Sequence, residues 1–372
     1  MLNRMPATES QPQAILIIRP SALGDVARSV PVAASLRHAY PDAQIDWLVR
    51  DDFADVVRAH PAVDHIIEFP RKQLRRWWRS PATAVKLMRY LRELARRGYD
   101  TVYDLQGLFR SGALSHRTGA TRRVGFANAR EGAAMFYNYR YRIDPSHHTV
   151  DRMLGLIEAD GVEMVRNMRL YVPTADQRWA DRMLREHDIQ DRQFAVVAPT
   201  SRWESKRWPI ERFTEVSDRL PELGIEAAVV VGSPGEEAQA AGLLALRGAG
   251  RLRVADLVGR TSVGQLMALI ERSAVVLCND SAALHIAVGL GKRAVAVYGP
   301  TDPSLVGPYR YERGWVGPPS TVSANYNFKR LDQAIISTVC VDAVWCRMQQ
   351  VMNAPGPALV HDQAPQGKRP AT

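Results

Sequence analysis

The sequence predicts an α/β protein with two doubly wound domains, each built on a mostly parallel β-sheet. Short apolar runs alternate with stretches of helical character along most of the chain, which is the order that strands and crossover helices produce. The length of 372 residues fits two domains of ordinary size. An apolar content of 46% and a charged content of 24% are those of a globular protein.

The first domain is expected to span residues 14–173. Its predicted strands are the short apolar runs at residues 14–18, 44–49, 65–69, 99–104 and 122–126. Its predicted helices cover residues 26–40, 51–59, 81–97 and 147–160, and a further one begins after Ser111. Residues 1–13 are polar and lack the apolar core of a secretory signal, so we predict that they are disordered.

The second domain is expected to span residues 193–352, after a linker at 174–192 that contains a polar helix. Its predicted strands lie at residues 194–198, 227–232, 274–277 and 293–298. Its predicted helices follow Glu236 and cover about residues 281–288 and 332–352. Residues 353–372 contain four prolines and almost no large apolar side chain, so we predict a disordered tail.

Much of the net charge of +10 comes from one segment, residues 71–97, which holds ten basic residues and one acidic residue. Trp77 and Trp78 lie within it. Basic side chains beside Trp are typical of surfaces that face anionic lipid head groups, so we expect contact with a membrane surface. A solvated helix face is the plainer alternative. No recognition-helix or RNA-binding signature accompanies the charge, so nucleic acid is not an expected partner.

Other features of the sequence limit the function. No apolar run reaches the roughly 18 residues that a transmembrane helix requires. Cys278, Cys340 and Cys346 do not have the spacing of a metal site, and so few cysteines suit a reducing cytoplasm. No Gly-x-Gly-x-x-Gly follows the first strand, so a dehydrogenase is not expected.

Residues 274–303 hold the most informative pattern. An apolar strand is followed by Asp280 and Ser281 at the start of a helix, and a second apolar strand ends near Tyr298. In open α/β sheets, ligands bind beyond the carboxyl ends of the strands, and a helix N-terminus there attracts phosphate. His285 shares a helix face with Ser281. The pattern indicates a phosphate-binding site, and an ordinary βαβ unit with a well-capped helix is the alternative.

Three charged residues follow other predicted strands. Asp25 closes the loop after the first strand, where a carboxylate can act as a general base or can cap the next helix. Lys206 follows the first strand of the second domain, where a cation can neutralise a leaving diphosphate or can belong to an exposed basic loop. Glu236 follows the strand that ends at Gly232, where it can bind a ribose hydroxyl or stabilise a helix N-terminus.

Four segments resemble motifs of the lipopolysaccharide heptosyltransferases, glycosyltransferase family 9. They are Ser21-Ala-Leu-Gly-Asp25, Lys206-Arg-Trp-Pro209, Asn279-Asp-Ser-Ala-Ala-Leu-His285 and Tyr298-Gly-Pro-Thr-Asp-Pro303. The resemblance covers about residues 14–350 and implies the GT-B fold, in which two Rossmann-like domains face each other across a central cleft. This chain has Ala282 where the family usually has Gly, and the methyl group narrows the approach of the backbone to a diphosphate.

The resemblance also implies roles for individual residues. Asp25 is the implied catalytic base. The implied donor-binding residues are Thr200, Ser201, Lys206, Glu236, Asp280, Ser281, Ala282, Ala283, Leu284 and His285. The implied acceptor-binding residues are Ser21, Gly24, Arg75, Arg76, Gln106, Arg110, Arg130 and His148.

The implied activity, most like that of heptosyltransferase I, is inverting transfer of L-glycero-D-manno-heptose from ADP-heptose to the Kdo of Kdo-lipid A. ADP-heptose is the donor substrate, and no cofactor is expected. The sequence contains no Asp-x-Asp, so the metal–diphosphate clamp of many other glycosyltransferases is missing and a metal-independent reaction is expected. The acceptor implies a cytoplasmic protein bound peripherally to the inner face of the inner membrane.

Two alternatives remain open. A related transferase could use another sugar nucleotide or another acceptor, such as the second heptose position or a protein. A relative without catalytic activity could bind a sugar nucleotide or a lipid.

Overall fold

The structure, a computed structural model, describes residues 11–74, 77–248, 251–318 and 333–359. The chain forms two compact units, one ending at Met168 and the other spanning Arg169–Leu359. This division falls a few residues before the boundary expected after residue 173. Each unit contains one six-stranded sheet in which every pair of neighbouring strands is parallel. The predicted fold class is confirmed.

The sheet of the first unit has the strand order β3-β2-β1-β4-β5-β6. Its strands are β1 (Ala14–Ile18), β2 (Gln44–Arg50), β3 (His65–Phe69), β4 (Thr101–Asp104), β5 (Arg122–Phe126) and β6 (Tyr139–Tyr141). The first five agree with the sequence prediction. Strand β6 lies in a stretch for which no element was predicted, because three residues are too few to show a pattern.

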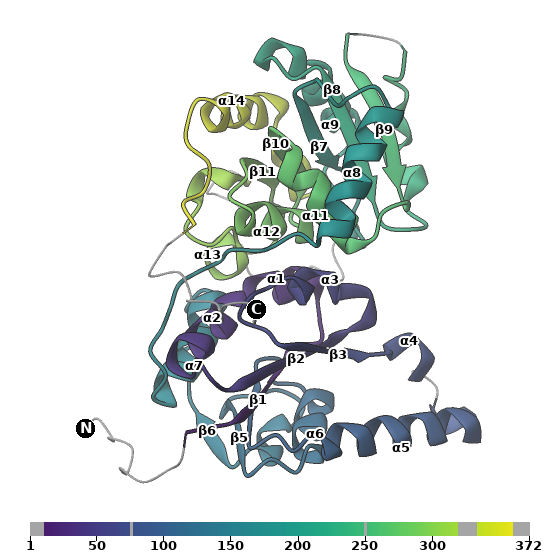
Figure 1. Ribbon diagram of the computed structural model, residues 1–372. Helices are drawn as coiled ribbons and strands as arrows, with labels where there is room; N and C mark the ends of the chain where they lie inside the picture. The colour runs from purple at the N-terminus through teal and green to yellow at the C-terminus, as the bar shows by residue number, and fades with distance from the viewer. Residues whose placement is uncertain (1–10, 75–76, 249–250, 319–332, 360–372) are drawn as a thin grey trace, which may run out of the picture. The chain divides into compact units, whose positions relative to one another are not determined.

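Helices cover both faces of this sheet (Figure 1). One face carries α1 (Leu23–Arg28), α2 (Val30–Ala39), α3 (Asp55–Arg58) and α7 (Thr149–Ala159). The other carries α4 (Arg71–Leu74), α5 (Pro81–Arg96) and α6 (Phe109–Arg117). Short 3₁₀ turns are η1 (Asp51–Phe53), η2 (Trp77–Arg79) and η3 (Ala133–Phe136).

The helix predicted over residues 26–40 is two helices. Helix α1 ends at Arg28, and α2 begins at Val30 with Pro31 in its first turn. Proline has no N–H to donate to the carbonyl four residues earlier, so a continuous helix would lose a bond at this point. The chain breaks at Ser29, whose hydroxyl donates to the Asp25 carbonyl at 2.6 Å. Asp25 therefore belongs to a separate helix of six residues.

The sheet of the second unit repeats the same topology, with the order β12-β11-β10-β7-β8-β9. Its strands are β7 (Phe194–Ala198), β8 (Ala227–Gly232), β9 (Arg253–Val258), β10 (Val275–Asn279), β11 (Ala294–Val297) and β12 (Trp315–Val316). The sequence prediction missed β9 and β12. Strand β9 contains Arg253 and Asp256, which interrupt its apolar run, and β12 has only two residues.

Two groups of helices pack on this sheet. Helices α9 (Ile210–Asp218), α10 (Ala241–Leu244) and α14 (Val341–Met352) contribute to one core cluster with the strands. Helices α8 (Thr174–Glu186), α11 (Val263–Arg272) and α12 (Ala282–Gly289) form the second group. The remaining short turns are η4 (Glu204–Lys206), η5 (Leu220–Leu223), η6 (Glu237–Ala240), α13 (Pro303–Val306), η7 (Glu312–Gly314) and η9 (Ile336–Thr338).

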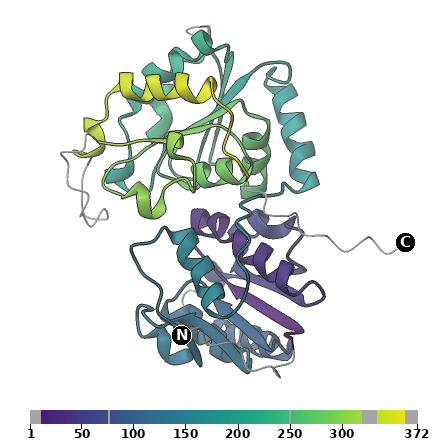
Figure 2. The same cartoon turned by 90° about the vertical axis from the view of Figure 1, so that its left-hand side faces the viewer.

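The ends of the second unit differ from two expectations. The helix expected in the linker is α8, and it packs on α11, where Arg272 Nε donates to Asp181 Oδ1 at 2.7 Å. Disorder was expected from Asn353 onwards, yet the Ala354 carbonyl accepts a hydrogen bond from Arg293 Nε at 3.0 Å. Figure 2 shows the segment after α14 returning along the unit. The expected disorder of residues 1–10 and 360–372 lies outside the described residues.

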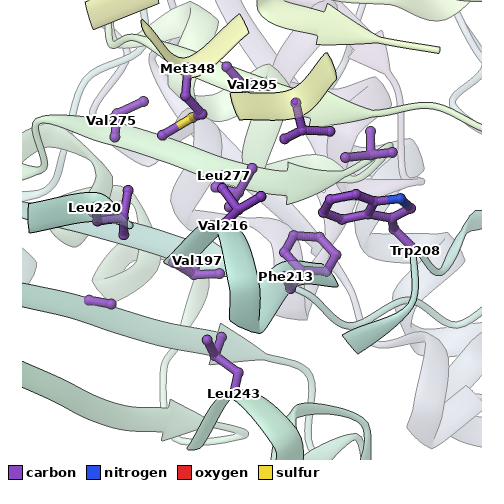
Figure 3. Close-up of a cluster of buried hydrophobic side chains, with 14 of the residues drawn as sticks. Val197, Trp208, Phe213, Val216, Leu220, Leu243, Val275, Leu277, Val295 and Met348 are labelled. Carbon is purple, nitrogen blue, oxygen red and sulfur yellow. The ribbon is translucent and has the colours of Figure 1, made fainter. Parts of the chain in front are cut away.

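Trp208 and Phe213 anchor the core of the second unit (Figure 3). Their rings meet edge to face, with 5.1 Å between centroids, and both side chains are fully buried. Trp208 Nε1 donates to the Val339 carbonyl at 2.9 Å, so the indole also satisfies its polar atom. The loop after β7 is thereby fixed to the core at its far end.

We predict that Phe213→Ala destabilises the protein by about 3–5 kcal/mol, because it removes a buried ring and leaves a cavity. Chemical denaturation followed by Trp fluorescence measures this change. Phe109→Ala is the matched control, because the Phe109 side chain is 51% exposed. Equal losses in the two variants would contradict the assignment of Phe213 to the core.

Candidate functional site

Each sheet reverses its strand order beside its first strand, and the loops that follow the two strands at that point diverge. In the first unit these are the loops after β1 and β4, and in the second unit those after β7 and β10. Open α/β sheets bind ligands at such positions. The predicted catalytic residue follows β1, and most predicted donor-binding residues follow β7 and β10. The two clusters are described separately below.

Asn279, at the end of β10, organises the cluster in the second unit. Its side chain is fully buried. Its Nδ2 donates to the Pro199 carbonyl at 2.7 Å, and its Oδ1 accepts from the Trp208 backbone N–H at 3.0 Å. Both ends of the loop after β7 are therefore tied to β10. The sequence analysis treated Asn279 as part of a motif and gave it no role.

Lys206 forms an ion pair with Asp280 across these two loops. Lys206 Nζ lies 2.6 Å from Asp280 Oδ2, and the side chains are 14% and 7% exposed. Such low exposure strengthens the attraction between the charges relative to a surface pair. Lys206 was predicted to meet a leaving diphosphate, and its pairing with Asp280 was not predicted. The pair fixes the cation beside the start of α12.

Helix α12 begins at Ala282, and Ser281 is its N-cap residue. The Ser281 backbone is extended, but its side chain makes no capping hydrogen bond to α12. A well-capped helix was the plainer alternative in the sequence analysis, but the Ser281 side chain does not cap α12 and Asp280 pairs with Lys206 instead. Ala282 is partly exposed, whereas Ala283 and Leu284 are buried. His285 is 4% exposed, so it is a packed residue of the first turns.

The loop after β8 joins the same edge. The Ser201 backbone N–H donates to Gln239 Oε1 at 3.1 Å, which connects the loops after β7 and β8. Thr200 is buried against Gly232, where an added Cβ would lie 2.7 Å from Thr200 Oγ1. Glu236 Oε2 accepts from the Ser233 N–H at 3.0 Å and so folds back on its own loop. Glu236 therefore lies in the predicted loop, but its carboxylate is bonded to the backbone of that same loop.

The motif that begins at Tyr298 also reaches this edge. At Gly299 an added Cβ would lie 2.7 Å from the Ser205 carbonyl, so the loop after β11 packs directly on the Lys206 loop. Thr301 Oγ1 is buried and has no hydrogen-bond partner within the described part of the chain. The sequence analysis quoted this motif but assigned none of its residues. An unsatisfied buried hydroxyl beside such a loop is a further candidate for ligand contact.

In the first unit, Asp25 lies between two arginines. Asp25 Oδ2 is 3.2 Å from an Arg19 guanidinium nitrogen, and Asp25 Oδ1 is 2.5 Å from one of Arg28. Asp25 Oδ2 also accepts from the Ala22 N–H at 3.2 Å. Burial alone would raise the pKa of this carboxyl, but the two guanidiniums and the N–H together hold its pKa well below the usual range.

This geometry revises the alternative reading of Asp25. The residue is not the N-cap of a helix; it lies in the first turn of α1 and bonds back to the N-cap residue, Ala22. Asp25 is ionised at any pH near neutrality. Its side chain remains 28% exposed, so a ligand can reach it. Gly24, predicted to contact the acceptor, precedes it in the same turn.

The loops after β1, β4 and β5 are tied together. Arg19 donates to the Leu105 carbonyl. The Ser21 N–H donates to Gln106 Oε1 at 3.4 Å, which brings together two predicted acceptor-binding residues. The Arg130 N–H donates to the Gly107 carbonyl at 3.0 Å. Arg110 and Arg130 are both exposed at this edge.

Asp104, the last residue of β4, holds the loop that carries Gln106. It is fully buried, and Oδ1 accepts from the N–H groups of Gln106 and Gly107 at 2.9 and 3.2 Å. The Tyr137 hydroxyl donates to Oδ2 at 2.7 Å. Burial raises the pKa of Asp104 despite these hydrogen bonds. Its role is to shape the loop.

Of the remaining predicted acceptor-binding residues, one has a structural role and two lie outside the described residues, and one further residue, Arg152, was not predicted. His148 is the N-cap of α7, and its Nδ1 accepts from the Val150 N–H at 3.2 Å, so it has a structural role that was not predicted. Burial lowers the pKa of Arg152, which lies on the same helix, and the nearby charges of Arg130 and Arg19 lower it further. Arg19, Arg130 and Arg152 therefore form a basic cluster. Arg75 and Arg76 lie outside the described residues.

Comparisons with known proteins identify the family of the chain. The family described as glycosyltransferase family 9 (heptosyltransferase) matches residues 87–333. The chain belongs to this family. It is a glycosyltransferase.

Individual family members are similar along most of their length. A curated relative, lipopolysaccharide heptosyltransferase 1 of Salmonella typhimurium, is 28% identical over 303 residues, which is 79% of this chain and 91% of the relative. The solved structure of Escherichia coli heptosyltransferase WaaC with ADP has a TM-score of 0.72 and 25% identity, covering 91% of this chain and 99% of that one. A family 9 glycosyltransferase from Veillonella parvula has a TM-score of 0.79 and 22% identity, covering 93% of this chain and 99% of that one.

The likeness to these solved structures assigns the two units to the GT-B fold class. Two features are absent from the described residues. No group of three or more His, Cys, Asp or Glu side chains within them has the arrangement of a metal site. No helix in the same residues is both long and apolar enough to cross a membrane.

We predict that Asp25→Asn lowers stability at pH 7 and that the difference from the wild type shrinks in acid. The native pKa of Asp25 is depressed, so its stabilisation is present above the unfolded value of about 3.9 and is lost as pH falls through the native pKa. Denaturation at neutral pH and near pH 3 compares the two proteins. Asp42→Asn is the control, because Asp42 is exposed and has no ion pair among the described residues. A difference that persists unchanged in acid would contradict the charge argument.

Proposed function

We propose that this family 9 enzyme is an inverting heptosyltransferase that transfers L-glycero-D-manno-heptose from ADP-heptose to the Kdo of the lipopolysaccharide inner core. One observation carries the proposal: Lys206 is held at the N-terminus of α12 by Asp280. The chain that contains this ion pair is 25% identical to a heptosyltransferase whose structure was solved with ADP. The curated relative named above, a lipopolysaccharide heptosyltransferase 1, supports the choice of acceptor.

On the donor side, the second unit supplies positive charge for the departing diphosphate. A Lys ammonium has three donors, so Lys206 can bind a phosphate oxygen while it keeps its contact with Asp280. The first turn of α12 adds backbone N–H groups and the positive end of the helix dipole. Together they stabilise the negative charge that develops on the diphosphate as its bond to the sugar breaks. Such a site has no need for a metal ion, so the proposed reaction is metal-independent.

The other donor residues are assigned by their place in the fold. Strand β8 is the second strand of its sheet, and Glu236 in the loop after it is proposed to exchange its bond with Ser233 for a ribose hydroxyl. Thr200, Ser201 and Thr301 are proposed to offer hydroxyl contacts. Ser281, Ala282, Ala283 and Leu284 contribute the backbone of the first turn, and His285 supports it by packing.

On the acceptor side, Asp25 is proposed to remove the proton of the attacking sugar hydroxyl. A carboxylate with a depressed pKa is a weak base, so it takes the proton late, after bond formation to the sugar carbon has made the hydroxyl acidic. A single displacement of this kind inverts the anomeric configuration. Ser21, Gly24, Gln106 and His148 are proposed to border the acceptor.

The arginines of the first unit suit an acidic acceptor. Arg110 and Arg130 are exposed at the carboxyl edge of the sheet, and a guanidinium binds carboxylate or phosphate with two parallel hydrogen bonds. Arg75 and Arg76 are proposed to share this role. Kdo-lipid A is both acidic and embedded in a membrane, so we propose that the enzyme works on the cytoplasmic face of the inner membrane.

Titration calorimetry of the purified protein with ADP, UDP and GDP, with and without EDTA, tests the donor assignment. We expect ADP to bind most tightly and its affinity to be unaffected by EDTA. A preference for UDP or GDP would keep the transferase and change the sugar nucleotide. No binding of any nucleotide would favour a relative without catalytic activity.

Asp25→Asn and Lys206→Ala should separate catalysis from donor binding. Loss of a general base lowers turnover by roughly 10²–10⁴-fold, so Asp25→Asn should lose turnover and bind ADP as the wild type does. Lys206→Ala should weaken ADP binding about tenfold or more, because a charge-assisted hydrogen bond is lost. Lys292→Ala, just beyond the other end of α12, is the matched control. Turnover is measured with ADP-heptose and Kdo-lipid A; full turnover by Asp25→Asn would leave Asp25 a purely structural role.

A further inference from the structure

The outer face of α5 exposes large apolar side chains. Five large hydrophobic residues are notably exposed in the described residues, and three of them lie within eleven positions of one another: Trp78 (66%), Val85 (59%) and Met88 (43%). Trp78 belongs to η2, which packs on α5. Exposed apolar groups gathered in one place mark an interaction surface.

These side chains are not needed by the core of their own unit. Helix α5 packs on the sheet through Leu87, Tyr90, Leu91 and Leu94, which lie against the cluster that includes Leu16 and Val102. By helical periodicity Val85 lies opposite the residues that pack on the cluster and Met88 lies on a flank of the helix, and both are exposed. Figure 1 shows α5 as a long helix that extends beyond the strands of its unit. Val85 and Met88 therefore remain exposed on the outer part of α5.

The same outer face is basic. Arg89, Arg92 and Arg96 follow Val85 and Met88 at helical spacing and are exposed. Lys86 is exposed beside them, and no ion pair joins any of these four basic residues to the described part of the chain. Glu93 is the one acidic residue of α5. We call the set Trp78, Val85, Lys86, Met88, Arg89, Arg92 and Arg96 the α5 face.

A groove between α4 and α5 opens next to the α5 face. Its volume is about 370 Å³, and its lining combines Lys86, Arg89 and Glu93 with apolar Leu74 and the ring of Tyr90. Two cationic groups beside apolar side chains suit a phospholipid head group and the carbon atoms next to it, and the one carboxylate leaves the lining with a net positive charge.

We propose that the α5 face docks the protein on an anionic phospholipid bilayer. The arginines and Lys86 lie at the level of the head-group phosphates, and Trp78, Val85 and Met88 enter the interfacial region between them. Charge complementarity selects this partner, since α5 and η2 together carry a strong excess of basic residues. A nucleic acid backbone would leave Val85 and Met88 exposed, so it explains only half of the face. The inference deepens the proposed function, because a lipid acceptor must be reached at such a surface.

The first test is flotation of the full-length protein with vesicles of phosphatidylcholine, with and without phosphatidylglycerol. We expect much tighter binding to the anionic vesicles than to the neutral ones. Arg89→Gln with Arg92→Gln should weaken it by about 25-fold, since each basic residue near an anionic surface contributes about fivefold. Glutamine keeps the helix propensity of arginine, so α5 should stay folded, and circular dichroism checks this.

The matched control is Arg182→Gln with Arg185→Gln. These two arginines have the same spacing on helix α8, are exposed, and give the same change of net charge. We expect this control to bind anionic vesicles as the wild type does. Equal weakening in both double variants would show that binding follows net charge, and no weakening in either would remove the α5 face; each result overturns the proposal.

A second variant, Val85→Thr with Met88→Gln, tests insertion. High salt screens the charges, so the binding that survives in the wild type should be lost in this variant. If this variant bound vesicles as tightly as the wild type at all salt concentrations, insertion of Val85 and Met88 would be ruled out. Competition with transfer RNA that displaces the protein from vesicles, and depends on Arg89 and Arg92, would assign the face to nucleic acid instead. Calorimetry with ADP on the same variants should match the wild type, so failure of the donor assignment and failure of the docking surface are distinguishable.

Discussion

The geometry of the cluster around Lys206 depends on the side chain of Asn279. Its two hydrogen bonds hold Pro199 and Trp208, the two ends of the loop that carries Lys206, against the end of β10. Asp280, the next residue, then lies where it can pair with Lys206. Because Asn279 is fully buried, breaking either bond would leave an unsatisfied polar group in the interior. A rigid amide thus sets the position of a cation that would otherwise move on a flexible stem.

In the first unit an arginine side chain fixes the position of the charged residue. Arg19, directly after β1, donates to the Leu105 carbonyl in the loop after β4 and also contacts Asp25. One buried guanidinium therefore joins the two loops at the strand reversal and fixes the charged residue between them. The charges of the two sites are opposite. In the second unit a carboxylate holds a cation, and in the first unit two cations hold a carboxylate. The cation pair keeps Asp25 ionised at the expense of its basicity.

The remaining charge of the first unit is divided between two surfaces. Arg110, Arg130 and Arg152 belong to the carboxyl edge of the sheet, whereas the arginines of α5 belong to a helix that covers its face. In the first group, Arg130 and Arg152 lie near Arg19, and the second group is mixed with exposed Val85 and Met88. This difference in apolar neighbours distinguishes the proposed contacts to the acidic sugar of the acceptor from the proposed contacts to a bilayer. Net charge alone does not make that distinction.

The sequence by itself determined the parallel α/β architecture and the positions of Asp25, Lys206 and Asp280 at strand ends, since these depend on short local patterns and on motifs of adjacent residues. Only the tertiary structure decided which of these residues meet. The Lys206–Asp280 pair joins residues that are 74 positions apart, and no local pattern encodes such a contact. The break at Ser29, the capping by His148 and the bond from Glu236 to Ser233 are different, because each joins residues two to four positions apart and follows from local geometry. The Lys206–Asp280 contact depends instead on β7 and β10 becoming neighbours in the sheet, and that strand order is a property of the fold.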